Sequence, residues 1–123
     1  MIKRITILTR KPGTTHDEFV RHWTQVHAAL LGSHPSVSRL VANDVLEFKR
    51  FGVRNPDPAR PAQNVQPEFE PDGFWELWFH DRESMEAMYA SDFVKQLVAD
   101  AENFVGSLWT FVVEEHVLLD RTA

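Results

Sequence analysis

The segment from Thr15 to Leu31 constrains the fold most, because it has the pattern of an amphipathic helix with a histidine on its apolar face. Thr15 and Glu18 form a capping-box pattern at its start, and Gly32 favours a left-handed turn at its end. Apolar residues recur at helical spacing in between, which predicts a helix that packs on a core. His27 falls inside this apolar stripe, where an imidazole needs a hydrogen-bond partner or a ligand.

The composition is that of a globular protein rather than a disordered chain or a polyanion-binding protein. The 123 residues are 43% hydrophobic and 25% charged, which predicts a single domain over residues 1–123 with a core of its own. A net charge of -5 without a Lys/Arg block argues against nucleic acid or an anionic membrane as the partner. The chain has no cysteine, which excludes disulfides, thiolate catalysis and zinc–thiolate sites.

The chain also shows no membrane or export signal. The apolar run at its start is too short for a signal peptide, and no stretch approaches the roughly 18 apolar residues of a membrane span. We therefore expect a cytoplasmic protein.

Four strand-like and two helix-like segments alternate in the order β-α-β-β-α-β. The strands are expected at residues 2–9, 37–42, 73–80 and 108–119. Asp81 is a good N-cap for the second helix, which is expected to break near Ser91, where Asp92 could act as a second cap. This order predicts an α+β, ferredoxin-like fold.

Two helices can cover only one face of such a sheet. Four large side chains of the third and fourth strands are too many for those helices to hide: Trp75, Phe79, Trp109 and Val113. The sequence therefore predicts that a second copy covers the bare face by sheet-to-sheet pairing, which gives a homodimer.

Residues from about 43 to 72 form a Pro-rich insertion. Five of the seven prolines lie between Pro56 and Pro71, among polar residues. Phe48, Phe51 and Phe69 gain from burial, so the insertion is expected to fold over the pocket or the dimer edge.

The segment MIKRITILTRKPGTTHDEFVRHWTQVHAALL resembles the start of the EthD-like family of dimeric α+β barrels. GFWELWFHD, the Phe of a Ser-Asp-Phe segment and the terminal EEHVLL add to the resemblance. It implies a ferredoxin-like protomer that pairs sheet to sheet and has a pocket between sheet and helices. Family relatives include polyketide dehydratases or cyclases, a methylmuconolactone isomerase-like group and proteins linked to ether degradation. A shared fold does not fix the reaction.

The first helix supplies three candidate site residues. His27 is the candidate catalytic residue, and the alternative is a core-edge histidine bonded to a backbone carbonyl or a loop. Trp23 is a core residue that could also form a pocket wall. His22 is either a substrate-binding residue or a solvated edge residue.

Further substrate-binding candidates lie on the strands: Thr6, Glu76, Trp78 and His116, with Arg4 on the same face as Thr6. His116 meets His27 if it faces the helices, and lies at the dimer interface if it does not. Alternation along the strands leaves this choice open.

The sequence predicts neither a metal nor a cofactor. Six histidines are present, but none form a His-x-His or His-x-x-x-His pair. His22 and His27 are five residues apart, which on a regular helix points them away from each other. A long-range combination of His27 with His116 and Glu76 remains open. No phosphate-binding loop, dinucleotide fingerprint or nucleophile motif is present.

Three functions are compatible with these features. The first is a cofactor-free enzyme in which His27 performs dehydration, cyclisation or isomerisation on a small apolar aromatic or lactone-like compound. The second is a non-catalytic protein that binds a hydrophobic small ligand or acts as an accessory subunit. The third is an oxidoreductase resembling the monooxygenase-like barrels linked to ether or aromatic degradation.

Overall fold

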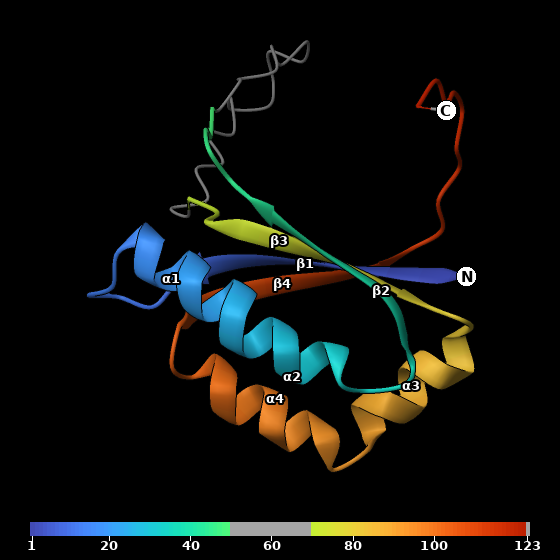
Figure 1. The fold of residues 1–123 in the computed structure, drawn as a ribbon, viewed down its shortest axis with the longest axis horizontal. Helices are drawn as coiled ribbons and strands as arrows, with labels where there is room; N and C mark the ends of the chain where they lie inside the picture. Colours follow the sequence, from blue (N-terminus) through green and yellow to red (C-terminus); the bar gives the residue numbers. More distant parts are fainter. Residues whose placement is uncertain (50–69, 123) are drawn as a thin grey trace, which may run out of the picture.

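The computed structural model describes residues 1–49 and 70–122 and contains one four-stranded sheet with helices on one of its faces (Figure 1). Its elements follow in this order: β1 (Ile2–Arg10), α1 (His16–His22), π-helix η1 (Trp23–His27), α2 (Ala28–Gly32), β2 (Val37–Asp44), β3 (Gly73–Phe79), α3 (Arg82–Ala90), α4 (Phe93–Ala101) and β4 (Val105–Val113). The strands are antiparallel in the order β2-β3-β1-β4. The predicted α+β, ferredoxin-like fold is confirmed.

The central strand β1 fixes which side chains face the helices. Leu8 is almost fully buried in the core between sheet and helices, and Thr6 and Arg4 follow on the same face because side chains alternate along a strand. Thr6 lies opposite Trp75 of β3 and Thr110 of β4. Ile5 and Ile7 point to the opposite, helix-free face, which we call the open face.

The core contradicts part of the expected distribution of aromatic residues. Trp75 and Phe79 were among the four residues that the helices were not expected to cover completely. Both are covered: they are 3% and 0% exposed and pack against the helices. Trp23 of η1 meets the Trp75 ring edge-on at 4.6 Å between centroids. The open face instead carries Trp109 and Phe111 of β4, which are 39% and 49% exposed.

The first helix begins as predicted and ends differently. The Thr15 hydroxyl accepts the backbone N–H of Glu18 at 3.1 Å, which caps α1. The left-handed turn expected at Gly32 is wrong, because Gly32 is the last residue of α2 and Ser33 follows with a helical φ of -73°. The Ser33 N–H bonds the Leu30 carbonyl at 3.2 Å, so the last turn closes without a left-handed residue.

The second helical segment breaks where the sequence predicted. Asp81 caps α3 by accepting the Ser84 N–H at 2.7 Å, and Ser91 is extended with ψ 167°. Asp92 precedes α4 but makes no capping hydrogen bond, so the expectation of a second side-chain cap is wrong. Its carboxylate pairs with Lys95 at 3.0 Å instead.

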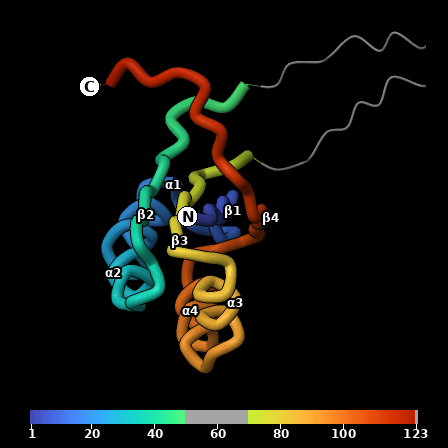
Figure 2. The backbone as a smooth tube through the Cα atoms, turned by 90° about the vertical axis from the view of Figure 1, so that its right-hand side faces the viewer, coloured from blue at the N-terminus to red at the C-terminus, as the bar shows by residue number. Residues whose placement is uncertain are grey.

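The last strand is shifted toward the N-terminus relative to its expected bounds of 108–119. β4 ends at Val113, which pairs with Lys3 of β1. β1 begins at Ile2, so only one of its residues lies beyond this pair. Residues 114–119 therefore have no neighbouring strand to pair with, and the chain after β4 runs away from the helices (Figure 2).

Gly73 begins β3 directly beneath the ring of Trp23. A Cβ at this position would overlap the indole carbons of Trp23 and lie 3.0 Å from the Asn43 carbonyl oxygen. Only glycine allows the strand and the helix to approach this closely.

The Pro-rich insertion is described only at its ends. The Val45 N–H bonds the Asp72 carbonyl at 3.1 Å, and Phe48 is 43% exposed. Phe51, Phe69 and most of the insertion that was expected to fold over the pocket or the dimer edge lie outside the described residues.

Candidate functional site

A cavity of about 230 Å³ lies between the sheet and the helices. β1 contributes Arg4 and Thr6 to its wall, and η1 contributes His27. The remaining wall is mainly apolar: Leu8, Leu31, Trp75, Leu77, Tyr89, Val94, Leu97, Val98, Ala101, Phe104, Val105, Leu108 and Thr110. The volume is below the roughly 300–1,000 Å³ of typical small-molecule sites, so the cavity suits a compact, largely apolar ligand.

His27 is the titratable residue that the helix brings to this cavity. It is 7% exposed, and its ring lies 5.1 Å from that of Phe104 and 6.0 Å from that of Trp75, between centroids. Its Nδ1–H donates to Oδ2 of Asp100 in α4 at 2.9 Å. The partner is a carboxylate rather than a backbone carbonyl, and Nε2 is the ring nitrogen left to meet a ligand.

The π-helical turn brings His22 to the same carboxylate. Over five residues a regular α-helix rotates by about 500°, which would separate the two imidazoles by about 140°. In η1 the Ala28 N–H bonds the Trp23 carbonyl five residues back, so one turn contains an extra residue. His22 Nε2–H therefore also reaches Asp100, at 2.9 Å from Oδ1, and the expectation that the two histidines diverge is wrong.

A side chain supports this wide turn. The Thr24 hydroxyl donates to the Val20 carbonyl at 2.7 Å. It thereby occupies a carbonyl oxygen at the point where the α-helical pattern changes.

Burial lowers the pKa of His27 below its usual value of about 6.5, although the hydrogen bond and the charge of Asp100 act in the opposite direction. Burial opposes ionisation of Asp100 too, but the hydrogen bonds from His27 and His22 outweigh it and lower the pKa of that carboxyl group. At neutral pH the pair therefore consists of a neutral imidazole held by a carboxylate. This is the protonation state that a general base requires.

Hydroxyl groups lie on the sheet side of the same cavity. Thr6 and Thr110 face each other across β1 and β4, with 3.2 Å between their hydroxyl oxygens. Tyr89 of α3 also lines the cavity, and burial raises the pKa of its phenol. The cavity thus combines one imidazole and the guanidinium of Arg4 with several neutral hydrogen-bonding groups in apolar surroundings.

Comparison with known proteins assigns a family to this arrangement. A family model of the EthD domain matches residues 11–107. The chain belongs to the EthD family. No significantly similar sequence is found among curated proteins.

Solved structures share the fold of this EthD domain at low sequence identity. An ethyl tert-butyl ether D (EthD) family protein from Bacillus halodurans has a TM-score of 0.66 and 20% identity over 94% of this chain and 99% of its own. A DABB family protein with a ferredoxin-like fold from Mesorhizobium loti has a TM-score of 0.64 and 9% identity, covering 94% and 96%. A dimeric ferredoxin-like protein from Thermobifida fusca has a TM-score of 0.60 and 9% identity, covering 91% and 88%.

Several residues predicted for the site lie elsewhere in the EthD domain. Trp23 is fully buried behind the cavity, and its indole Nε1 has no hydrogen-bond partner in the part of the chain that the structure describes. Glu76 and Trp78 lie on the open face, where Glu76 binds Lys3 at 2.7 Å. Trp78 Nε1–H donates to Glu115 of the C-terminal segment at 2.6 Å.

His116 lies in the exposed segment after β4 rather than on a strand. The structure therefore places His27 and Thr6 in the wall of one cavity and links His22 to His27 through Asp100, outside that wall. Glu76, Trp78 and His116 lie elsewhere. The long-range combination of His27, His116 and Glu76 is not formed. Within residues 1–49 and 70–122, no group of three or more metal-ligating side chains is placed to hold an ion.

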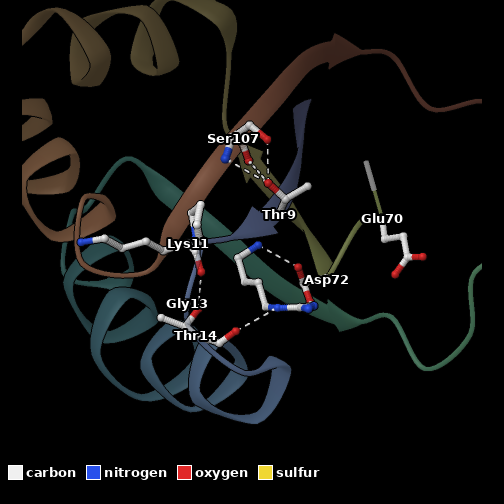
Figure 3. A pocket seen from close by; sticks show the side chains of 9 residues that line it. Thr9, Lys11, Gly13, Thr14, Glu70, Asp72 and Ser107 are labelled. Carbon is white, nitrogen blue, oxygen red and sulfur yellow. Dashed lines mark hydrogen bonds and ion pairs between the residues drawn. The ribbon is translucent and has the colours of Figure 1, made fainter. Parts of the chain in front are cut away.

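A second hollow of about 310 Å³ lies at the carboxyl end of β1, and its wall is polar (Figure 3). Asp72 accepts the backbone N–H of Arg10 at 2.7 Å and its guanidinium Nη1 at 3.1 Å. Behind it, His16 donates Nδ1–H to Asp72 at 2.8 Å and Nε2–H to Asp44 at 2.7 Å. These four residues satisfy one another, so we assign the cluster to structure: it joins the start of α1 to the ends of the Pro-rich insertion.

Three residues at or beside the cavity were not predicted from the sequence. Asp100, Tyr89 and Thr110 are the carboxylate partner of His27 and two of the hydroxyl groups on the wall. Asp100 is 73 residues from His27, and local spacing cannot reveal such a pair. The requirement that a buried imidazole has a partner was the available signal, but it does not say which residue the partner is.

No helix among the described residues is long and apolar enough to cross a membrane.

Proposed function

We propose that this EthD-family protein is an acid/base enzyme that acts on a small, largely apolar ring compound, with His27 as the proton-transferring residue. The observation that carries the proposal is the buried His27 in the wall of an apolar cavity of about 230 Å³, hydrogen-bonded from behind to the partly buried Asp100. A neutral imidazole oriented by a carboxylate is suited to accept a proton at Nε2.

In the proposed step, Nε2 removes a proton from the carbon next to a carbonyl group. The C–H electron pair forms the new C=C bond, and the carbonyl π electrons move onto oxygen to give an enolate. Thr6 or Thr110 donates a hydrogen bond to that oxygen, while Asp100 stabilises the imidazolium. Return of the proton from the imidazolium to another carbon completes an isomerisation. In a dehydration, the enolate expels a β-hydroxyl group, which takes the imidazolium proton and leaves as water. In a cyclisation, the enolate carbon forms a bond to a second carbonyl carbon of the same molecule, and the oxygen of that carbonyl takes the proton.

The apolar wall supports the preference for an aromatic or lactone-like ring. Trp75, Leu77 and Phe104 offer flat or aliphatic surfaces but no charges. A low local polarity also strengthens the hydrogen bonds that stabilise an enolate.

We also propose that the protein is a homodimer formed through the open face. Trp109 and Phe111 are 39% and 49% exposed there, beside Ile5 and Ile7 of β1. Large exposed side chains of this kind are typical of association surfaces. The Thermobifida fusca protein of similar fold is dimeric. Light scattering that gave a stable monomer at micromolar concentration would contradict the proposal.

Exchange of carbon-bound protons tests the enzymatic proposal without requiring the natural substrate. Small cyclic ketones and lactones are incubated with the protein in deuterated buffer, and loss of the α-proton signal is followed by NMR. We expect wild type to accelerate exchange in compounds that fit the cavity. Replacing His27 by Gln should lower that rate by about 10²–10⁴-fold with little change in affinity.

His80→Gln is the matched control, because His80 is exposed and outside the cavity wall. Its exchange rate should equal that of wild type. Binding of these compounds without exchange above the buffer rate would favour the alternative function, a non-catalytic protein that binds an apolar ligand.

A further inference from the structure

Arg4 places a positive charge in the wall of the apolar cavity, without an acidic partner among the described residues. Arg4 lies two residues before Thr6 on the helix-facing side of β1, and it lines the same cavity as His27. Its guanidinium stacks on the ring of Tyr89, with 3.9 Å between Cζ and the ring centroid. Its Nε is buried and has no hydrogen-bond partner within residues 1–49 and 70–122. Over the described ranges, no carboxylate pairs with Arg4.

The two other cations of β1 are paired with acids, although one is more buried than Arg4 and the other is more exposed. Lys3 lies between Glu76 and Glu115 on the open face, and Arg10 binds Asp72. Arginine keeps its charge throughout the physiological pH range, and a buried N–H without an acceptor is costly. A carboxylate supplied by a ligand accounts for the unmatched charge of Arg4.

We propose that the ligand of this cavity is a small ring compound that carries a carboxylate, and that Arg4 binds this carboxylate. Stacking on Tyr89 covers a face of the guanidinium and leaves its terminal Nη–H groups for a two-bond contact with a carboxylate. Two residues along a strand span about 7 Å, so a ring bound at Arg4 extends past Thr6 toward His27. The inference rests on the proposed function for its choice of cavity and names the class of substrate.

Binding of matched neutral and charged probes tests this assignment. Benzoate and cyclohexanecarboxylate are compared with benzamide and cyclohexanecarboxamide, which have the same shape but no charge, by calorimetric titration. Wild type should bind the carboxylates about 10- to 100-fold more tightly than the amides, the range for a hydrogen bond to a charged group. Arg4→Gln should remove this preference and leave amide affinity unchanged.

Arg39→Gln is the matched control, because Arg39 also stacks on an aromatic ring, that of Trp78, at 4.6 Å but on the open face. It should keep the carboxylate preference. Arg4→Lys, which keeps the charge but loses the planar fork, should retain only part of it. In wild type, benzoate should shift the Arg4 Nε–H resonance in NMR spectra, a readout that does not depend on the folding of any variant.

Equal affinity for carboxylate and amide, no binding of either, or an unchanged preference in Arg4→Gln would each overturn the proposal. Its failure is distinguishable from that of the proposed function, because His27→Gln should bind benzoate as wild type does. Arg4-dependent binding without proton exchange would support the carboxylate as ligand but contradict the proposed enzymatic function. Proton exchange without a preference for carboxylates would support the enzymatic function but contradict the carboxylate ligand.

Discussion

Two histidine–aspartate clusters in this protein use the same groups in opposite proportions. At the cavity, Asp100 accepts hydrogen bonds from two imidazoles, those of His27 and His22. Near the Pro-rich insertion, the imidazole of His16 donates to two carboxylates, those of Asp72 and Asp44. The pKa of His27 is lowered and that of His16 is raised.

The difference shows that a carboxylate neighbour does not by itself decide the charge of a histidine. His27 has one shared carboxylate and a side chain only 9% exposed, so desolvation of the charged form dominates. His16 can donate from both nitrogens only as an imidazolium, and its side chain is 34% exposed. The buried cluster (His27, His22 and Asp100) thus contains a neutral imidazole at His27 near neutral pH, whereas the outer cluster (His16, Asp72 and Asp44) favours an imidazolium held by two carboxylates.

The largest expected effect comes from removing the charge of the buried cluster. Asp100→Asn keeps the side-chain shape but no longer fixes the tautomer of His27 or stabilises its imidazolium. Proton exchange should fall by about 10²–10⁴-fold, as measured by NMR in deuterated buffer. Asp92→Asn on the same helical segment, 94% exposed at its side chain, should leave the rate unchanged. An Asp100→Asn variant with wild-type exchange would show that the carboxylate only supports the fold.

The next effect concerns stability and separates the two acids of the outer cluster. Asp72 is 4% exposed and accepts bonds from Arg10 and His16, so Asp72→Ala should lower the free energy of unfolding by about 2 kcal/mol, after allowing for the exposure of both partners. Asp44 has a side chain 42% exposed, and Asp44→Ala should cost about 0–1 kcal/mol. Urea denaturation measures both. Equal losses would mean that burial does not distinguish the two carboxylates.

The smallest expected effect is a pair of opposite pH dependences. The raised pKa of His16 means that its stabilisation is fully present below its unfolded pKa of about 6.5 and is lost as pH rises through the folded value. The lowered pKa of His27 means that protonation destabilises the fold, so a cost develops as pH falls below about 6.5. The stability difference between wild type and His16→Gln should therefore shrink as pH rises. The difference between wild type and His27→Gln should shrink as pH falls.

These profiles should be compared above about pH 5, where Asp72 and Asp100 remain ionised because both have lowered pKa values. The urea midpoint of each variant is measured at each pH against wild type. Profiles of the same sign would remove the distinction between the two clusters.

The fold could be predicted because its signals are local. Alternation along β1 placed Thr6 and Arg4 on one face and Ile5 on the other, and the register confirms this division. The Thr15 and Asp81 caps were readable because each involves a hydroxyl or carboxylate three residues before its donor. The end of β4 was not readable, since it depends on where β1 begins.

The candidate site was readable only in part, because its geometry depends on long-range contacts. The apolar stripe identified His27, but the π turn that aligns it with His22 has no distinct spacing in the sequence. Asp100 was absent from the sequence-based prediction because nothing local links it to the first helix. Glu76 and His116 were grouped with His27 on residue type alone, and the structure separates all three.

The close approach of Gly73 to Trp23 makes these two positions interdependent during sequence divergence. Any larger residue at 73 would displace the indole that forms the back of the π turn, so it becomes acceptable only together with a smaller side chain at 23. Relatives should therefore change the two positions as a pair, with alanine or serine at 73 accompanied by a reduced ring or aliphatic residue at 23. In a double-mutant cycle, Gly73→Ala should be less damaging when Trp23 is Leu than in the wild-type background.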